Sequence, residues 1–119
     1  MKKSNNSIRI KAFQLKSENQ KLSQIESLLK SFNSLVIQLQ KQIHIEEQNS
    51  SIFDKKSYLY PTAAKACAVR AEKLQLSINK LDNERMVIIN NVANLVEELS
   101  KLQRLELTQP RPAERRKKA

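Results

Sequence analysis

Two stretches of this sequence place apolar residues at every seventh position, and this repeat restricts the possible folds more than any other feature. The first stretch carries the repeat at Ile8, Leu15, Leu22, Leu29, Val36 and Ile43. The second carries it at Cys67, Leu74, Leu81, Ile88, Leu95 and Leu102. Further apolar residues three positions away complete a heptad pattern in both stretches. A strict seven-residue repeat predicts α-helices that supercoil around each other in a left-handed sense.

The two repeats also match each other in register. In an antiparallel hairpin, residues that face each other have numbers with a constant sum. Here that sum is 110, as for Leu15 with Leu95 and for Phe32 with Ile78. We therefore predict an all-α fold, a long antiparallel two-helix coiled-coil hairpin over residues 1–108. Its parts are a helix over about 6–49, a loop over 50–60 and a helix over about 61–107.

Prolines mark the ends of the second predicted helix. Pro61 suits a first helical turn, where its missing N–H costs nothing, and Pro110 and Pro112 stop the helix. Residues 109–119 contain five basic residues, one acid and no apolar side chain larger than Ala or Pro. We predict that this tail is a disordered basic segment.

The composition excludes several classes of function. The 119 residues fit one domain, and with no Gly the chain has neither a P-loop nor a Rossmann turn. One Cys and one His cannot form the usual zinc sites, and a lone Cys favours a reducing compartment. Cys67 lies in the apolar repeat and His44 beside it, without a pocket that excludes water. We expect no enzymatic activity, no catalytic residue, no metal and no cofactor.

Three polar residues interrupt the apolar repeat: Lys11, Glu18 and Arg85. Such residues usually fix the register of a coiled coil at a cost in stability, and they can also mark contacts with a partner. The sequence leaves both interpretations open.

The net charge of +10 lies mainly in the first helix and the tail, which carry +4 each. This charge fits weak, nonspecific nucleic-acid binding, an acidic protein partner or an anionic membrane surface. With five aromatic residues the chain has little to offer as a stacking platform for single strands. The longest apolar run, residues 86–89, is far too short to span a membrane.

Apolar residues outside the repeat are candidates for binding. On the helices they are Ile10, Phe13, Ile37, Ile45, Val69, Leu76, Met86, Val87 and Leu107. The loop adds Ile52, Phe53, Tyr58, Leu59 and Tyr60. Nine such residues on a two-helix hairpin suggest binding strips. The loop group folds back to cap the hairpin, forms a partner site, or does both.

Three stretches resemble the flagellar export protein FliJ family in its alphaproteobacterial form. They are the opening Ser7–Gln14 with Gln24–Glu26, the segment Tyr60–Ala66, and the closing Val96–Leu102. The resemblance covers nearly the whole predicted hairpin, roughly Ser7 to Glu106. The fewer charges in the second half of the first helix and the short, Pro-broken tail depart from the family pattern.

The resemblance implies a component of the flagellar type III protein export apparatus, involved in flagellum biogenesis and motility. Family members act as a coiled-coil shaft in a hexameric export ATPase, contact the cytoplasmic domain of the membrane export gate and assist the cycling of substrate chaperones. For this chain the expected ATPase contacts are Arg9, Ile10, Phe13, Lys16, Lys101, Arg104 and Leu105. The expected gate contacts are Ile37, Ile45, Tyr58, Tyr60, Val69 and Leu76.

The expected location is the cytoplasm, with peripheral association at the inner-membrane export apparatus and no specific nucleic acid as partner. Two alternatives remain open from the sequence. One is a basic coiled-coil protein associated with nucleic acid or ribosomes, and the other is a free-standing export chaperone.

Overall fold

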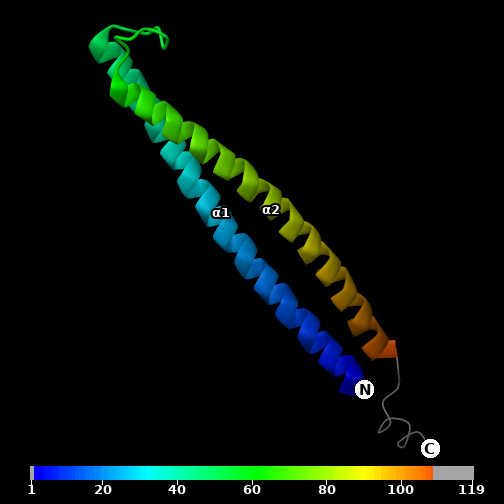
Figure 1. Ribbon diagram of the computed structural model, residues 1–119. Coiled ribbons are helices and arrows are strands. Elements are labelled where there is room, and N and C mark those ends of the chain that lie inside the picture. The colour runs from blue at the N-terminus through cyan, green and yellow to red at the C-terminus, as the bar shows by residue number, and fades with distance from the viewer. Residues whose placement is uncertain (1, 109–119) are drawn as a thin grey trace, which may run out of the picture. The chain divides into compact units, whose positions relative to one another are not determined.

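A computed structural model describes the backbone of residues 2–108 and contains two α-helices (Figure 1). Helix α1 covers Lys2–Ser50, drawn in blue to cyan, and helix α2 covers Thr62–Thr108, drawn in green to orange. Residues 51–61 connect them, and no strand occurs in the described part of the chain. The predicted all-α helical hairpin is confirmed.

The helix ends differ slightly from the predicted ones. Helix α1 begins at residue 2 and not at residue 6. Pro61 precedes α2 by one residue, and its carbonyl oxygen accepts the N–H of Lys65 at 3.1 Å, so it forms the entry to the helix. The predicted basic tail, residues 109–119, lies outside the described residues.

The chain divides into two compact units. The loop unit consists of residues 24–85 and contains the connection between the helices. The terminal unit is described over residues 2–23 of α1 and 86–108 of α2. Each unit pairs a segment of α1 with a segment of α2.

One ion pair between the helices reports the register in each unit. In the terminal unit Lys11 Nζ lies 2.5 Å from Glu98 Oε2. In the loop unit Arg85 Nη1 lies 3.8 Å from Glu26 Oε2. The residue numbers in these pairs add up to 109 and 111, one on either side of the predicted sum. The antiparallel register is therefore confirmed in both units, and each seam cation pairs with an acid beside the seam, as a register-fixing role requires.

The seam, meaning the residues of the seven-residue repeats, is buried more deeply in the loop unit. The buried hydrophobic residues of the described chain are Val36, Leu39, Tyr60, Ala64, Ile78 and Ile88. All except Ile88 belong to the loop unit. The other seam residues are half-buried, because each helix covers only one side of its neighbour.

The connection leaves α1 through a left-handed residue. Ser51 has a φ of 62°, a conformation that glycine usually supplies at the end of a helix and that costs other residues free energy. The chain has no glycine, and the side chain of Ser50 stabilises the turn instead. Its hydroxyl donates to the carbonyl oxygen of Glu47 at 3.1 Å and accepts the N–H of Ile52 at 3.1 Å.

Two further side chains shape the connection. The carboxylate of Asp54 accepts the N–H of Lys56 at 3.0 Å, and the hydroxyl of Ser57 accepts the N–H of Leu59 at 3.2 Å. Short polar side chains of this kind stabilise turns by bonding to the backbone two residues on. The connection therefore consists of turns that side-chain to backbone hydrogen bonds stabilise.

Tyr60 closes the end of the loop unit. Its side chain is buried, and its hydroxyl donates to Glu47 Oε2 at 2.8 Å. Burial and the neighbouring Glu47 carboxylate both raise the pKa of Tyr60. The expectation that Tyr60 is exposed is wrong, because this ring packs inward and its hydroxyl already has a partner. Of the two interpretations of the loop group, capping therefore holds for Tyr60.

Candidate functional site

The helices carry the predicted strips of exposed apolar side chains. All nine residues that the sequence placed outside the repeat are exposed, with fractions from 47% at Ile45 to 85% at Leu107. In the connection, Phe53, Tyr58 and Leu59 are exposed as well. Exposed apolar side chains of this kind can form a surface that binds a partner.

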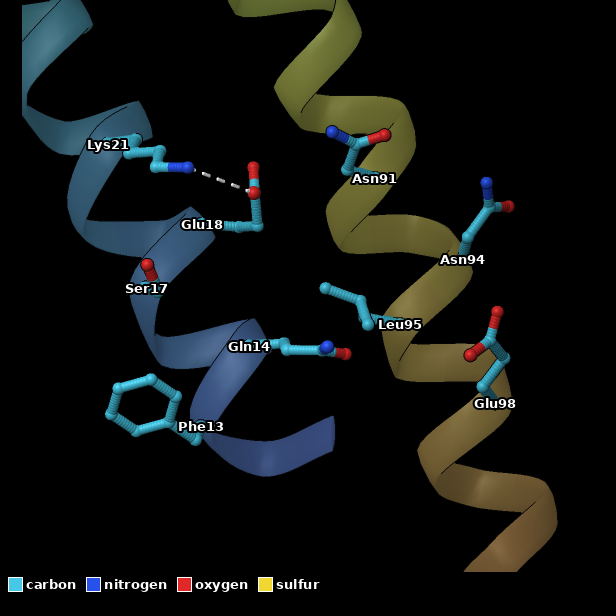
Figure 2. Close-up of a pocket in the computed structure, with 9 residues that line it drawn as sticks. All are labelled: Phe13, Gln14, Ser17, Glu18, Lys21, Asn91, Asn94, Leu95 and Glu98. Carbon is cyan, nitrogen blue, oxygen red and sulfur yellow. Dashed lines mark hydrogen bonds and ion pairs between the residues drawn. The ribbon is translucent and has the colours of Figure 1, made fainter. Parts of the chain in front are cut away.

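A polar groove lies along one side of the terminal unit (Figure 2). It encloses about 470 Å³ and is lined by Phe13, Gln14, Ser17, Glu18, Lys21, Asn91, Asn94, Leu95 and Glu98. Gln14 and Leu95 point toward each other from the two helices, whereas Phe13 points away from α2 (Figure 2). We call this side of the terminal unit the polar edge.

The charged groups of the polar groove are neutralised within the unit. Lys21 Nζ lies 3.4 Å from Glu18 Oε1, and Glu98 pairs with Lys11. The lining that remains is amide, hydroxyl and apolar. Such a groove suits hydrogen bonding to the polar groups of a partner, because its two carboxylates are already engaged in ion pairs.

The predicted ATPase contacts fall into two groups. Ile10 and Phe13 lie together, since both line a second hollow, of about 640 Å³, near the N-terminal end of α1. Arg9 lines the same hollow, whereas Lys16 projects about 120° around α1 from Ile10. Lys16 lines a different hollow, described below, on the side opposite the polar edge. The structure therefore does not bring this set into one surface.

The α2 members of the same set divide in the same way. Leu105 is 53% exposed and projects toward the polar edge, whereas Arg104 projects toward the opposite side. Lys101 pairs with Glu97 at 3.4 Å.

The predicted gate contacts occupy three places in the loop unit. Ile37 and Ile45 line a hollow of about 430 Å³ on the outer face of α1, together with His44. Val69 and Leu76, one heptad apart on α2, form a short exposed stripe that points away from the seam. Tyr58 is 90% exposed in the connection.

Sequence reasoning overlooked several apolar residues that border the seam. Leu28, Leu35 and Val96 are exposed by 45%, 40% and 50%. They occupy the heptad positions that flank the seam, where a two-stranded coiled coil usually carries charge. The signal was present in the sequence, because an apolar stripe that is wider than the seam is typical of a helix with more than one neighbour.

The side chains that most often serve in catalysis or metal binding form no site in the described residues. Cys67 is a free, half-buried thiol, and His44 is exposed. Among the described residues no group of three or more His, Cys, Asp or Glu side chains is placed to hold a metal ion. Within residues 2–108 neither helix has a stretch that is both long and apolar enough to cross a bilayer.

No family model, no curated protein and no solved structure shows significant similarity to this chain.

Proposed function

We propose that this chain is a non-enzymatic coiled-coil component of the flagellar type III protein export apparatus. In this role it acts as a shaft or connector between the hexameric export ATPase and the cytoplasmic domain of the membrane export gate, and it assists the cycling of substrate chaperones. It works in the cytoplasm, peripherally associated with the inner-membrane export apparatus. The proposal rests on the three stretches that resemble the FliJ family and on one structural observation.

That observation is the presence of exposed apolar side chains on both units. Ile10 and Phe13 are 56% and 73% exposed in the terminal unit, and Leu76 is 66% exposed in the loop unit. Exposed apolar groups of this size are unfavourable in water and favour burial against partners. A connector needs one such surface for each of the two proteins that it joins.

The arrangement of the resembling stretches supports the same role. Lys11 belongs to the opening stretch and Glu98 to the closing stretch, and their ion pair holds the two together in the terminal unit. The third stretch begins at Tyr60, which closes the loop unit. The ATPase contact is accordingly assigned to the terminal unit around Ile10 and Phe13. The gate contact is assigned to the loop unit, with Tyr60 omitted.

The proposal is tested by titrating the full chain with the purified export ATPase and with the gate's cytoplasmic domain from the same organism. Ile10→Ser with Phe13→Ser should weaken ATPase binding by at least about tenfold and leave gate binding within about twofold. Ile37→Ser with Leu76→Ser should do the reverse. The two double variants are matched controls for each other, because all four side chains are more than half exposed and should tolerate Ser without loss of fold.

Two outcomes would overturn the proposal. If the wild-type chain binds neither protein but retains RNA, with affinity that falls steeply with salt, the net charge of +10 points to the nucleic-acid alternative. If it binds one exported subunit in a stoichiometric complex and ignores the ATPase, it is a free-standing chaperone.

A further inference from the structure

Helix α2 carries a second apolar strip in the terminal unit. The α2 strip consists of Met86, Ile89, Ala93 and Val96, whose spacing of three, four and three residues is that of a coiled-coil seam. It lies about 120° around the helix from the seam that faces α1. Met86 and Val96 are each 50% exposed, Ala93 is exposed and Ile89 is half-buried. The strip therefore repeats the pattern of a packed seam without a helix covering it in the described chain.

A hollow lies on the same side of the unit. It encloses about 440 Å³ and is lined by Ala12, Leu15, Lys16, Asn19, Gln20, Ser23 and Leu99. Leu99 projects to the strip side of the seam, whereas Leu95 projects into the polar groove on the other side. Small side chains such as Ala12 and Ser23 let another backbone approach α1 closely. We call this side, with the strip and the hollow, the apolar edge.

The charges on the apolar edge are unbalanced. In the described part of the terminal unit Lys11, Lys21 and Lys101 each form an ion pair. Three further cations of the terminal unit, Arg9, Lys16 and Arg104, form no ion pair with any described residue.

These three cations border the apolar edge from both helices. Lys16 lines the hollow from α1, and Arg9 lies one heptad before it, where it also lines the hollow of Ile10 and Phe13. Arg104 lies about five turns beyond Met86 on the same line of α2. The acid Glu97 borders the strip, but it is already paired with Lys101. The apolar edge is thus an apolar stripe with a basic border.

We propose that the apolar edge of the terminal unit is a docking site for an acidic amphipathic α-helix of another protein, which completes a three-helix bundle. The apolar stripe of that helix packs on the α2 strip and over the hollow, and its Asp or Glu residues face Arg9, Lys16 and Arg104. A helix laid in an apolar groove gains affinity from the buried stripe, and the charges at its borders select the partner. This inference does not rest on the proposed function.

Charge and composition disfavour the other occupants. The last eleven residues of this chain contain five basic residues and no apolar side chain larger than Ala or Pro, so they match neither the stripe nor its border. A second copy would bring two sets of Arg9 and Lys16 to one interface, where like charges repel.

The test uses the full chain and a fluorescent synthetic helix about three heptads long, with Leu at the seam positions and Glu at the flanking positions. A control peptide keeps the Leu stripe and replaces every Glu by Lys. We expect the acidic peptide to bind, the basic peptide to bind at least about tenfold more weakly, and the affinity of the acidic peptide to fall as salt rises.

Variants locate the site. Met86→Gln with Val96→Gln removes apolar surface, and Arg9→Glu with Lys16→Glu reverses the border. Each pair should weaken binding of the acidic peptide by at least about tenfold. Val69→Gln is the matched control, because Val69 is 50% exposed like Val96 but lies in the loop unit. It should leave the affinity within about twofold, and circular dichroism should show the same helicity for all variants.

Three results would overturn the proposal. The first is equal affinity for the acidic and basic peptides. The second is a concentration-dependent dimer in sedimentation equilibrium that Met86→Gln with Val96→Gln abolishes, which assigns the edge to a second copy. The third is displacement of the acidic peptide by RNA at stoichiometric concentration, which assigns the basic border to nucleic acid.

Discussion

The loop unit and the terminal unit are built from the same repeat, yet they pack differently. Five of the buried hydrophobic residues lie in the loop unit and only Ile88 lies in the terminal unit. In the loop unit the chain reverses through bonded turns and Tyr60 closes the end. The terminal unit has polar residues in its seam and hollows on both sides of it. The comparison shows that an apolar repeat alone does not bury a seam. The burial of the seam depends as much on the side chains beside it and on the turns and Tyr60 that close its end.

The largest expected effect concerns seam residues of similar size in the two units. Ile78 in the loop unit is 8% exposed, and Leu99 in the terminal unit is half-buried. Ile78→Ala should lower the free energy of unfolding by about 3 kcal/mol, through lost burial and a residual cavity. Leu99→Ala should lower it by about 1–2 kcal/mol, because less surface leaves water at that position.

Urea denaturation followed by circular dichroism measures both variants. Hydrogen exchange should in addition show faster opening of residues 8–22 than of residues 29–43, because the terminal unit has fewer buried contacts. Equal losses in the two alanine variants, with equal exchange in the two segments, would remove the distinction between the units.

A smaller effect is expected from repairing the terminal seam. Lys11 lies in the seam, and its side chain and that of Glu98 are 33% and 49% exposed, so their ion pair contributes little. Lys11→Leu should raise the free energy of unfolding by about 1 kcal/mol, because a leucine there completes the apolar repeat. Lys21→Leu, at an exposed position outside the seam, should change it by no more than about 0.5 kcal/mol. A loss of stability in Lys11→Leu would show that the charge itself holds the terminal unit together.

The smallest effect concerns pH and the closure of the loop unit. Because the pKa of Tyr60 is raised in the folded protein, the folded state keeps this proton at a pH where the unfolded state loses it. This contribution to stability is therefore fully present below about pH 10 and is lost as the pH rises further. Thermal melts between about pH 8 and 11 should show a steeper decline for the wild type than for Tyr60→Phe.

Tyr58→Phe serves as the control for the pH experiment, because Tyr58 is 90% exposed. It should follow the wild-type decline. The same slope in Tyr60→Phe and in the wild type would mean that the bond to Glu47 does not contribute to closure.

The sequence predicted the helices and the exposed strips, because both follow from spacing along a single helix, and it predicted the register, because the repeats of the two helices match. Val36 and Ile78 are buried at the positions that the repeat assigns them. The burial of Tyr60 could not be predicted in this way, because residues 51–61 have no period and their turns depend on side-chain to backbone bonds. The α2 strip was missed because the heptad was assigned to one seam, which left Ile89 and Val96 without a role.

The constant sum that pairs the helices also limits how such a chain can change in length during evolution. A residue inserted into α1 between Val36 and Ile43 would rotate every later α1 position about 100° away from its partner on α2. A deletion has the same effect in the opposite sense. Lasting changes within the paired helices must therefore come as whole heptads, inserted at mirrored places in both helices, whereas residues 51–61 are free of this limit. Between the first and the last paired residues, homologues of this protein should differ in length by paired multiples of seven or in the connection.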